Sequence, residues 1–223
     1  DGHWHEANKK RYQTVLRDPS QNIVEDLRAK YIQPLSPVVA GGKRHLSILK
    51  KNDYGKGGYH DHYWFAFYDP KAGSKTKSVQ LFVRFLGGEE VWRYGFSMGN
   101  YCGEYLERLS TTLHANRQAV ADYVRTAPPD TIVRLECAET TTDLTPDEFA
   151  DRLVNATDPA LVADATLINV NVIRELPLAT LPEHMDGLID EIGEYFRWNW
   201  PFFDASVTGA WNVGTKTISK PNE

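Results

Sequence analysis

Four short segments rich in β-branched and aromatic residues follow one another in the first half of the chain, and they limit the fold more than any other feature. They lie at residues 45–51, 62–68, 78–86 and 91–98. The connections between them are too short for the crossover that parallel strands require. Gly87-Gly88, between the last two, is typical of a tight hairpin turn. The sequence therefore predicts an antiparallel four-strand meander.

Apolar residues at helical spacing precede this meander. We expect one helix over residues 4–16 and a second that starts at Asp18-Pro19, where aspartate is a preferred cap and proline suits the first helical position. Pro34 and Pro37 should end the second helix, because proline disfavours helical conformation in the residue before it.

Helices and strands alternate after the meander. Thr145 and Glu148 form a capping box at the start of one of these helices. Helices are expected at residues 103–125, 145–155 and 181–198, and strands at 131–138 and 166–175. The order predicts an α+β fold with a largely antiparallel sheet, a four-strand meander plus two later strands, flanked by helices. We expect residues 1–223 to form a single domain, with 127–130 as the place for any subdomain boundary.

The overall composition is that of a folded, water-soluble protein, with 41% hydrophobic and 25% charged residues. No apolar run approaches the roughly 18 residues of a membrane span, so no membrane partner is expected. Cys102 and Cys137 are too few for a disulfide scaffold and fit a reducing compartment, which favours a cytoplasmic location. The chain begins at Asp1 without a methionine, and we expect it to be a piece of a longer protein.

Charge is divided unevenly along the chain. Residues 1–129 carry 19 Lys and Arg against 13 Asp and Glu, whereas residues 130–223 carry 6 against 17. The basic excess is sharpest from Lys43 to Arg84, with nine basic and three acidic residues. Such a local excess is what an anion-binding face needs, although a charge run is more often a solvated surface.

Motifs for catalysis are missing from the sequence. It contains no phosphate-binding P-loop, no Gly-x-Ser-x-Gly elbow, no His-Glu-x-x-His and no paired-cysteine zinc spacing. Glu89 and Glu90 could supply paired carboxylates, but they lie beside the Gly87-Gly88 turn, so we interpret them as charged residues at the tip of a hairpin. Glu136 and Glu139 lack the lysine of a nuclease-type site. We therefore expect a chain that is not itself an enzyme and that uses no cofactor.

One segment, residues 50–68, combines the features of a nucleic-acid surface. Its glycines allow close backbone approach, its lysines can neutralise phosphates, and its aromatic rings can stack on bases or enclose a flipped base. Alternate aromatics (Tyr63, Phe65, Phe67) are expected to face the core, which leaves Trp64 or Tyr68 pointing outward. The predicted nucleic-acid-binding residues are Lys50, Lys51, Tyr54, Lys56, Tyr59, His60, Trp64, Lys75 and Lys77.

Two other functions stay open at this point. His60 and His62 share one face of a strand and would form part of a metal-dependent hydrolase site with Asp53 or Asp61. Alternatively, the chain is a protein-interaction module of a multidomain ATPase or GTPase. Its docking surface would then be an exposed aromatic patch formed by Trp198, Trp200, Phe202 and Phe203, although residues of this kind more often pack against the body of the domain.

Several stretches resemble known bacterial sequences over residues 4–125. The tryptophan-led helix with Asn-Lys-x-x-Tyr at residues 8–12 resembles the opening of a family of uncharacterised bacterial domains. Residues 51–57, the Trp64 strand, 80–83 and 93–96 resemble the N-terminal regions of McrB-like AAA+ restriction proteins. The resemblance implies a DNA-recognition domain of a restriction or phage-defence system. Its partners would be double-stranded DNA, unmodified or methylated, an AAA+ motor domain and a nuclease subunit.

Overall fold

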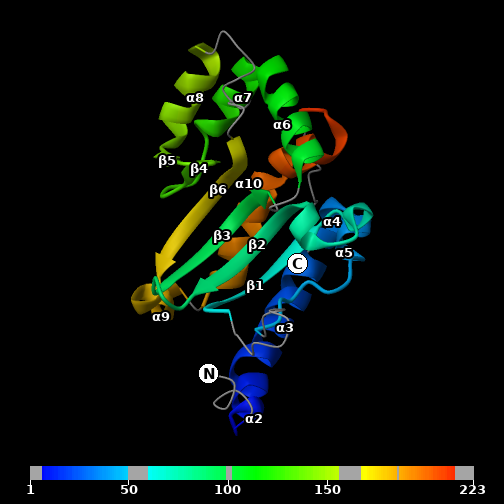
Figure 1. Cartoon of the computed structure of the whole chain (residues 1–223), viewed down its shortest axis with the longest axis vertical. Coiled ribbons are helices and arrows are strands. Elements are labelled where there is room, and N and C mark those ends of the chain that lie inside the picture. The colour runs from blue at the N-terminus through cyan, green and yellow to red at the C-terminus, as the bar shows by residue number, and fades with distance from the viewer. Residues whose placement is uncertain (1–6, 50–59, 99–101, 156–166, 185, 214–223) are drawn as a thin grey trace, which may run out of the picture.

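The computed structural model describes residues 7–49, 60–98, 102–155, 167–184 and 186–213. Its centre is a six-stranded antiparallel sheet with the strand order β1-β2-β3-β6-β4-β5 (Figure 1). The strands are β1 (His62–Tyr68), β2 (Val79–Leu86), β3 (Val91–Met98), β4 (Ile132–Cys137), β5 (Thr141–Leu144) and β6 (Leu167–Pro177). The α+β class and the antiparallel sheet flanked by helices are thus confirmed. The acidic half of the chain completes the sheet, because β6 pairs with β3.

The described part of the meander has three regular strands rather than the expected four. Residues 45–49 run beside β1, but they pair through one isolated bridge, between Leu46 and Phe65. A side chain interrupts the ladder here, because the Trp64 amide donates to Ser47 Oγ at 3.0 Å. The sequence prediction also missed β5, a four-residue strand that is mostly exposed and polar and shows no hydrophobic alternation.

The N-terminal helices form one continuous helical run rather than two separate helices. It comprises α2 (Lys9–Tyr12), a π-helical segment at 13–17, α3 (Asp18–Leu27), a second π-helical segment at 28–32, and α4 (Gln33–Leu35). The prediction that Asp18 caps a new helix was wrong, because its backbone is helical. Each π-helical segment ends two residues before a proline (Pro19 and Pro34), and its wider turn accommodates the missing amide hydrogen.

The remaining helices follow the sequence more closely. They are α5 (Pro37–Ala40), α6 (Gly103–Ala115), α7 (Arg117–Val124), α8 (Pro146–Asn155), α9 (Leu181–His184) and α10 (Leu188–Thr208). The capping box at α8 is confirmed, since the Glu148 amide donates to Thr145 Oγ1 and the Thr145 amide donates to the Glu148 carboxylate. The expected helix over 103–125 is divided at Asn116, whose backbone leaves the helical region.

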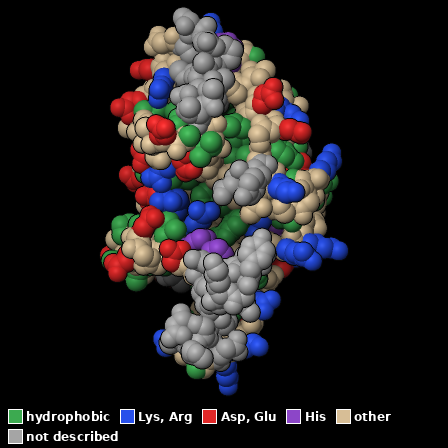
Figure 2. Space-filling view, in the orientation of Figure 1, with side chains coloured by type: hydrophobic (Ala, Val, Ile, Leu, Met, Phe, Trp, Pro, Cys, Tyr) green, Lys and Arg blue, Asp and Glu red, His purple; other side chains and the backbone are tan. Residues whose placement is uncertain are grey.

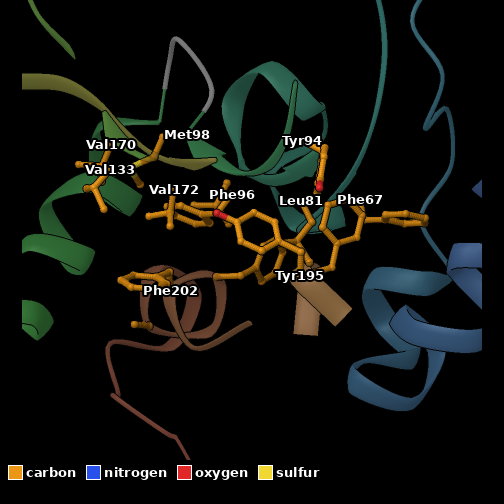
Figure 3. Close-up of a cluster of buried hydrophobic side chains, with 14 of the residues drawn as sticks. Phe67, Leu81, Tyr94, Phe96, Met98, Val133, Val170, Val172, Tyr195 and Phe202 are labelled. Atoms are coloured by element: carbon orange, nitrogen blue, oxygen red, sulfur yellow. The ribbon is translucent and has the colours of Figure 1, made fainter. Parts of the chain in front are cut away.

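The long helix α10 covers one face of the sheet and builds the main core (Figure 3). It continues ten residues beyond the predicted end at Trp198 and passes through Pro201. A proline inside a helix costs about 3 kcal/mol. Here the burial of Phe202 and Phe203, each worth roughly 1.5–3 kcal/mol, offsets that cost.

The contact between α10 and the N-terminal helical run depends on a glycine. A Cβ atom at Gly193 would lie 2.2 Å from the ring of Tyr31. Tyr31 is buried there, and its hydroxyl donates to Asp190 Oδ1 at 2.9 Å. Glycine at this position therefore lets the two helices approach within ring contact.

The two faces of the sheet differ in chemistry. Phe65 and Phe67 point toward α10 and join the main core, as the alternation predicted. Trp64 belongs to the opposite face, which is the one turned toward the viewer in Figure 1. We call this second surface the open face; Lys, Arg and His side chains gather over its middle (Figure 2).

Candidate nucleic-acid interface

A pocket of about 420 Å³ lies on the open face. Five strands contribute to it, mostly through alternate residues, because successive side chains of a strand point to opposite faces of the sheet. Its lining combines aromatic, basic, amide and carboxylate groups. The residues are His60, His62, Trp64, Thr76, Gln80, Phe82, Arg84, Arg93, Ser97, Met98, Arg134, Glu136, Asn169, Asn171 and Ile173. We call this cavity the sheet pocket.

Strand register arranges these residues in rows across the sheet. In the middle row, Phe82 pairs with Gly95, and Gly95 pairs with Ile173. Directly paired residues of an antiparallel sheet share a face, so this row forms an apolar floor with no side chain at its centre. The neighbouring row pairs Trp64 with Arg84 and Arg84 with Arg93, which makes one side of the pocket basic.

Two of the three arginines in the sheet pocket are neutralised within the sheet. Arg93 Nε donates to Glu175 Oε1 at 2.5 Å. Arg134 contacts Asp143 through two nitrogens, at 2.7 and 2.8 Å, and also reaches Glu175. The hydrogen bonds from Arg134 hold the pKa of Asp143 below its ordinary value. These two arginines therefore have their charges satisfied by carboxylates from the acidic half of the chain.

Arg84 differs from the other two arginines. Within the described residues it has no carboxylate at ion-pair distance, and its Nε is buried without a hydrogen-bond partner. Its guanidinium carbon lies 5.6 Å from the ring centres of Trp64 and Phe82. Burial, and then repulsion from Arg93, lowers its pKa. A guanidinium held in this way can donate hydrogen bonds to an anionic or carbonyl ligand, in a position where water is partly excluded.

The opposite side of the sheet pocket carries a carboxylate that is likewise without an ionic partner among the described residues. Asn171 Nδ2 donates to Glu136 Oε1 at 2.8 Å, and Asn169 Nδ2 donates to Glu136 Oε2 at 3.2 Å. Asn169 is fixed in turn, because the Met98 amide donates to its Oδ1 at 3.1 Å. The two asparagines orient Glu136, and each carboxylate oxygen retains capacity to accept a further hydrogen bond.

Lys75 takes a structural position beside the sheet pocket. Its Nζ lies 4.4 Å from the ring centre of Trp64 and donates to the carbonyl oxygen of His45 at 2.8 Å. Burial lowers the pKa of Lys75 to about 7. The amine thus ties residues 44–45 to the indole, and it is not extended into solvent like a typical phosphate-binding lysine.

The structure brings together only some of the predicted site residues. His60 and Trp64 line the sheet pocket, and Lys77 is exposed at the end of a short 3-10 helix before β2. Lys50, Lys51, Tyr54, Lys56 and Tyr59 lie outside the described residues. The prediction missed Arg84, Glu136 and the two asparagines. The sequence feature that could have indicated these four residues is the alternation of polar side chains along strands whose other face packs against the core.

The features that favoured the two other functions are only partly present. The rings of His60 and His62 lie 4.9 Å apart, and His62 contacts Asp61, whereas Asp53 lies outside the described residues. The described part of the chain contains no group of three or more His, Cys, Asp or Glu placed to hold a metal. The aromatic patch that a docking surface would need is not exposed, because Phe202 and Phe203 are buried and Trp198 and Trp200 pack against the core, which is the usual fate of such residues.

Comparisons with protein-family models, curated proteins and solved structures found no match to this chain. The resemblance to McrB-like proteins therefore stays a prediction. Among the helices that the structure describes, none has the length and apolar character needed to cross a membrane.

Proposed function

We propose that this chain is a DNA-binding domain that reads a base, unmodified or methylated, in the sheet pocket. The observation that carries the proposal is Arg84, a partly buried guanidinium that has no carboxylate partner among the described residues. The other two arginines of the sheet pocket, Arg93 and Arg134, are paired, so within the described part of this pocket Arg84 differs from both in lacking a carboxylate. A buried cation of this kind costs stability unless a ligand compensates it.

The charges of the pocket suit a nucleotide. Arg84 and Glu136 lie on opposite sides of the apolar floor formed by Phe82 and Ile173. A ligand that satisfies both needs an anionic or carbonyl group for the guanidinium and an amino group for the carboxylate. Cytosine and adenine carry such amino groups, and carboxylates accept hydrogen bonds from the cytosine amino group. The flat apolar floor would contact the ring of the base.

Pocket size and aromatic content support the same proposal. A cavity of about 420 Å³ falls within the roughly 300–1,000 Å³ typical of small-ligand sites. Trp64 and the neighbouring histidines offer flat surfaces at its rim. A base buried here would have to leave its stack in the duplex, as the target base does in enzymes that modify or remove bases.

The wider setting of the proposal comes from the resemblance. We assign the domain to a cytoplasmic restriction or phage-defence system in which this chain supplies specificity without catalysis. An AAA+ motor domain and a nuclease subunit would perform hydrolysis and cleavage. The basic excess of the first half would raise the rate of encounter with DNA.

A fluorescence titration with short DNA duplexes tests the proposal. Unmodified, cytosine-methylated and adenine-methylated duplexes are compared at low and moderate salt. We expect salt-sensitive binding that favours one of the three. Arg84→Met should weaken it at least tenfold, and Glu136→Gln should reduce the difference between the duplexes. Arg117→Met, which changes an exposed arginine of α7, serves as the control.

Two results would contradict the proposal. The first is no binding to any duplex at protein concentrations well above the micromolar range. The second is an Arg84→Met variant that binds as tightly as the Arg117→Met control, since the unpaired guanidinium would then have no part in binding.

A further inference from the structure

A second cavity, of about 730 Å³, lies between the N-terminal helical run and residues 42–49. Arg17, Gln21 and Arg28 contribute from the helices, and residues 42–49 form the opposite wall. We call this cavity the basic groove. It is distinct from the sheet pocket, because no residue lines both.

The groove has a positive charge that its own residues do not cancel. Of the described residues that line it, Glu25 is the one carboxylate, and it is already bound by Arg28 and by Gln21 Nε2 at 2.8 Å. Lys43 and Arg44 are exposed, and neither has a carboxylate at ion-pair distance in the described part of the chain. Arg17 makes one long contact, to Gln13 at 3.5 Å. Three cations therefore face solvent along one cavity.

Backbone geometry at the groove is unusual. Arg44 has φ of 60°, in the left-handed region that residues with a side chain rarely adopt. Such a conformation costs of order 1 kcal/mol or more and persists where neighbouring contacts fix it. Lys75 supplies one of these contacts, through its hydrogen bonds to the carbonyl oxygens of Arg44 and His45.

The basic groove and the sheet pocket share a wall. Ser47 lines the groove and Trp64 lines the pocket, and the two are joined by hydrogen bonds in both directions. The Ser47 amide donates to the Trp64 carbonyl at 2.7 Å, and the Trp64 amide donates to Ser47 Oγ at 3.0 Å. Lys75 spans the same wall, since it contacts the Trp64 ring and the backbone of residues 44–45. The two cavities are therefore neighbours, and residues 44–47 separate them.

We propose that the basic groove binds the sugar–phosphate backbone of the DNA strand whose base enters the sheet pocket. This inference rests on the proposed function and adds a second contact site to it. Arg17, Lys43 and Arg44 contact successive phosphates, which follow one another closely along a strand, about 3.4 Å of helix axis apart. The groove contributes affinity without sequence preference, whereas the pocket supplies specificity.

The test compares a charge-reversal variant with a matched control. Lys43→Glu/Arg44→Glu changes the groove, and Arg117→Glu/Arg152→Glu changes two exposed arginines on α7 and α8 by the same amount. Affinity for a 12-base-pair duplex is measured from about 50 to 200 mM salt. We expect the groove variant to bind at least tenfold more weakly at low salt. Its slope of log affinity against log salt should be shallower by about 2, roughly one for each lost phosphate contact.

The outcomes separate this inference from the proposed function. Equal affinity and slope in the groove variant and the control, with DNA binding otherwise intact, overturn the groove assignment alone. No DNA binding by the unaltered chain overturns both. Equally tight binding of poly-glutamate of the same charge would show a general polyanion site, and it also overturns the assignment. If the charge-reversal variant does not fold, Lys43→Gln/Arg44→Gln replaces it, with an expected slope change in the same direction.

Discussion

Replacing Arg84 by methionine should separate stability from binding. Methionine keeps much of the aliphatic stem that packs on the open face but removes the guanidinium. Arg84 has no carboxylate partner in the described structure, whereas Arg93, its direct neighbour on β3, is bound by Glu175 and Glu89. The two arginines face the same row of the sheet, so Arg93→Met is a matched control.

The magnitudes follow from the contacts of each side chain. In Arg84→Met, removing a buried polar group without a partner gains about 1–3 kcal/mol. Losing two cation–π contacts costs about 0.5–1 kcal/mol each. The unfolding free energy of Arg84→Met should therefore equal that of the unaltered chain or be slightly higher, so the variant should be as stable or slightly more stable. Arg93→Met removes a charge-assisted hydrogen bond of 2.5 Å and should cost about 1.5–3 kcal/mol.

Thermal and urea unfolding of the two variants measure the difference directly. A gap of about 2 kcal/mol corresponds to roughly 4–8 °C in Tm for a chain of this size. Relief of the repulsion between the two arginines is common to both variants and cancels in the comparison. The same Arg84→Met protein should lose DNA affinity. An Arg84→Met variant that is destabilised as much as Arg93→Met would refute the reasoning and make Arg84 a structural residue.

Two further predictions concern stability. Gly193→Ala places a Cβ 2.2 Å from the Tyr31 ring. The cost of overpacking should exceed the gain in helix propensity by about 1–2 kcal/mol, which would lower the urea midpoint of unfolding. A variant more stable than the unaltered chain would contradict this. Burial lowers the pKa of Lys75 to about 7 from its ordinary 10.5. Between these values the unfolded chain binds a proton that the folded chain lacks, so stability should rise with pH from about 7 to 9. Lys75→Met should flatten that rise, and an unchanged slope would count against it.

Much of the fold could be predicted from local patterns. The strands β2 and β3 and the capped start of α8 carry strong short-range signals, in hydrophobic alternation and in a capping box. Prolines misled the prediction, because Pro19 and Pro201 normally mark helix boundaries. Tertiary packing decided otherwise: the π-helical segment accommodates Pro19, and buried phenylalanines hold α10 together past Pro201.

The candidate site was harder to predict because its residues come from strands far apart in the sequence. The basic and aromatic residues near position 64 led the prediction to the strand that borders the sheet pocket, and His60 and Trp64 line that pocket. The roles of Arg84 and Glu136 depend on which neighbours pair with them. Arg93 has a carboxylate partner from β6, whereas Arg84 has none in the described structure, and sequence alone does not distinguish the two.

The position of β6 has a consequence for how the chain folds. One edge of β3 is covered by a strand that begins about 70 residues later in the sequence. Pairing over such a separation slows folding, because a long loop must close before the contacts form. Until β6 has been synthesised, the β3 edge of the β1–β3 meander has no strand to pair with. Such an unpaired edge can pair wrongly with another chain. Arg93, which in that interval lacks its later partner Glu175, and Arg84, which has no carboxylate partner in the described structure, would repel a second copy of the meander.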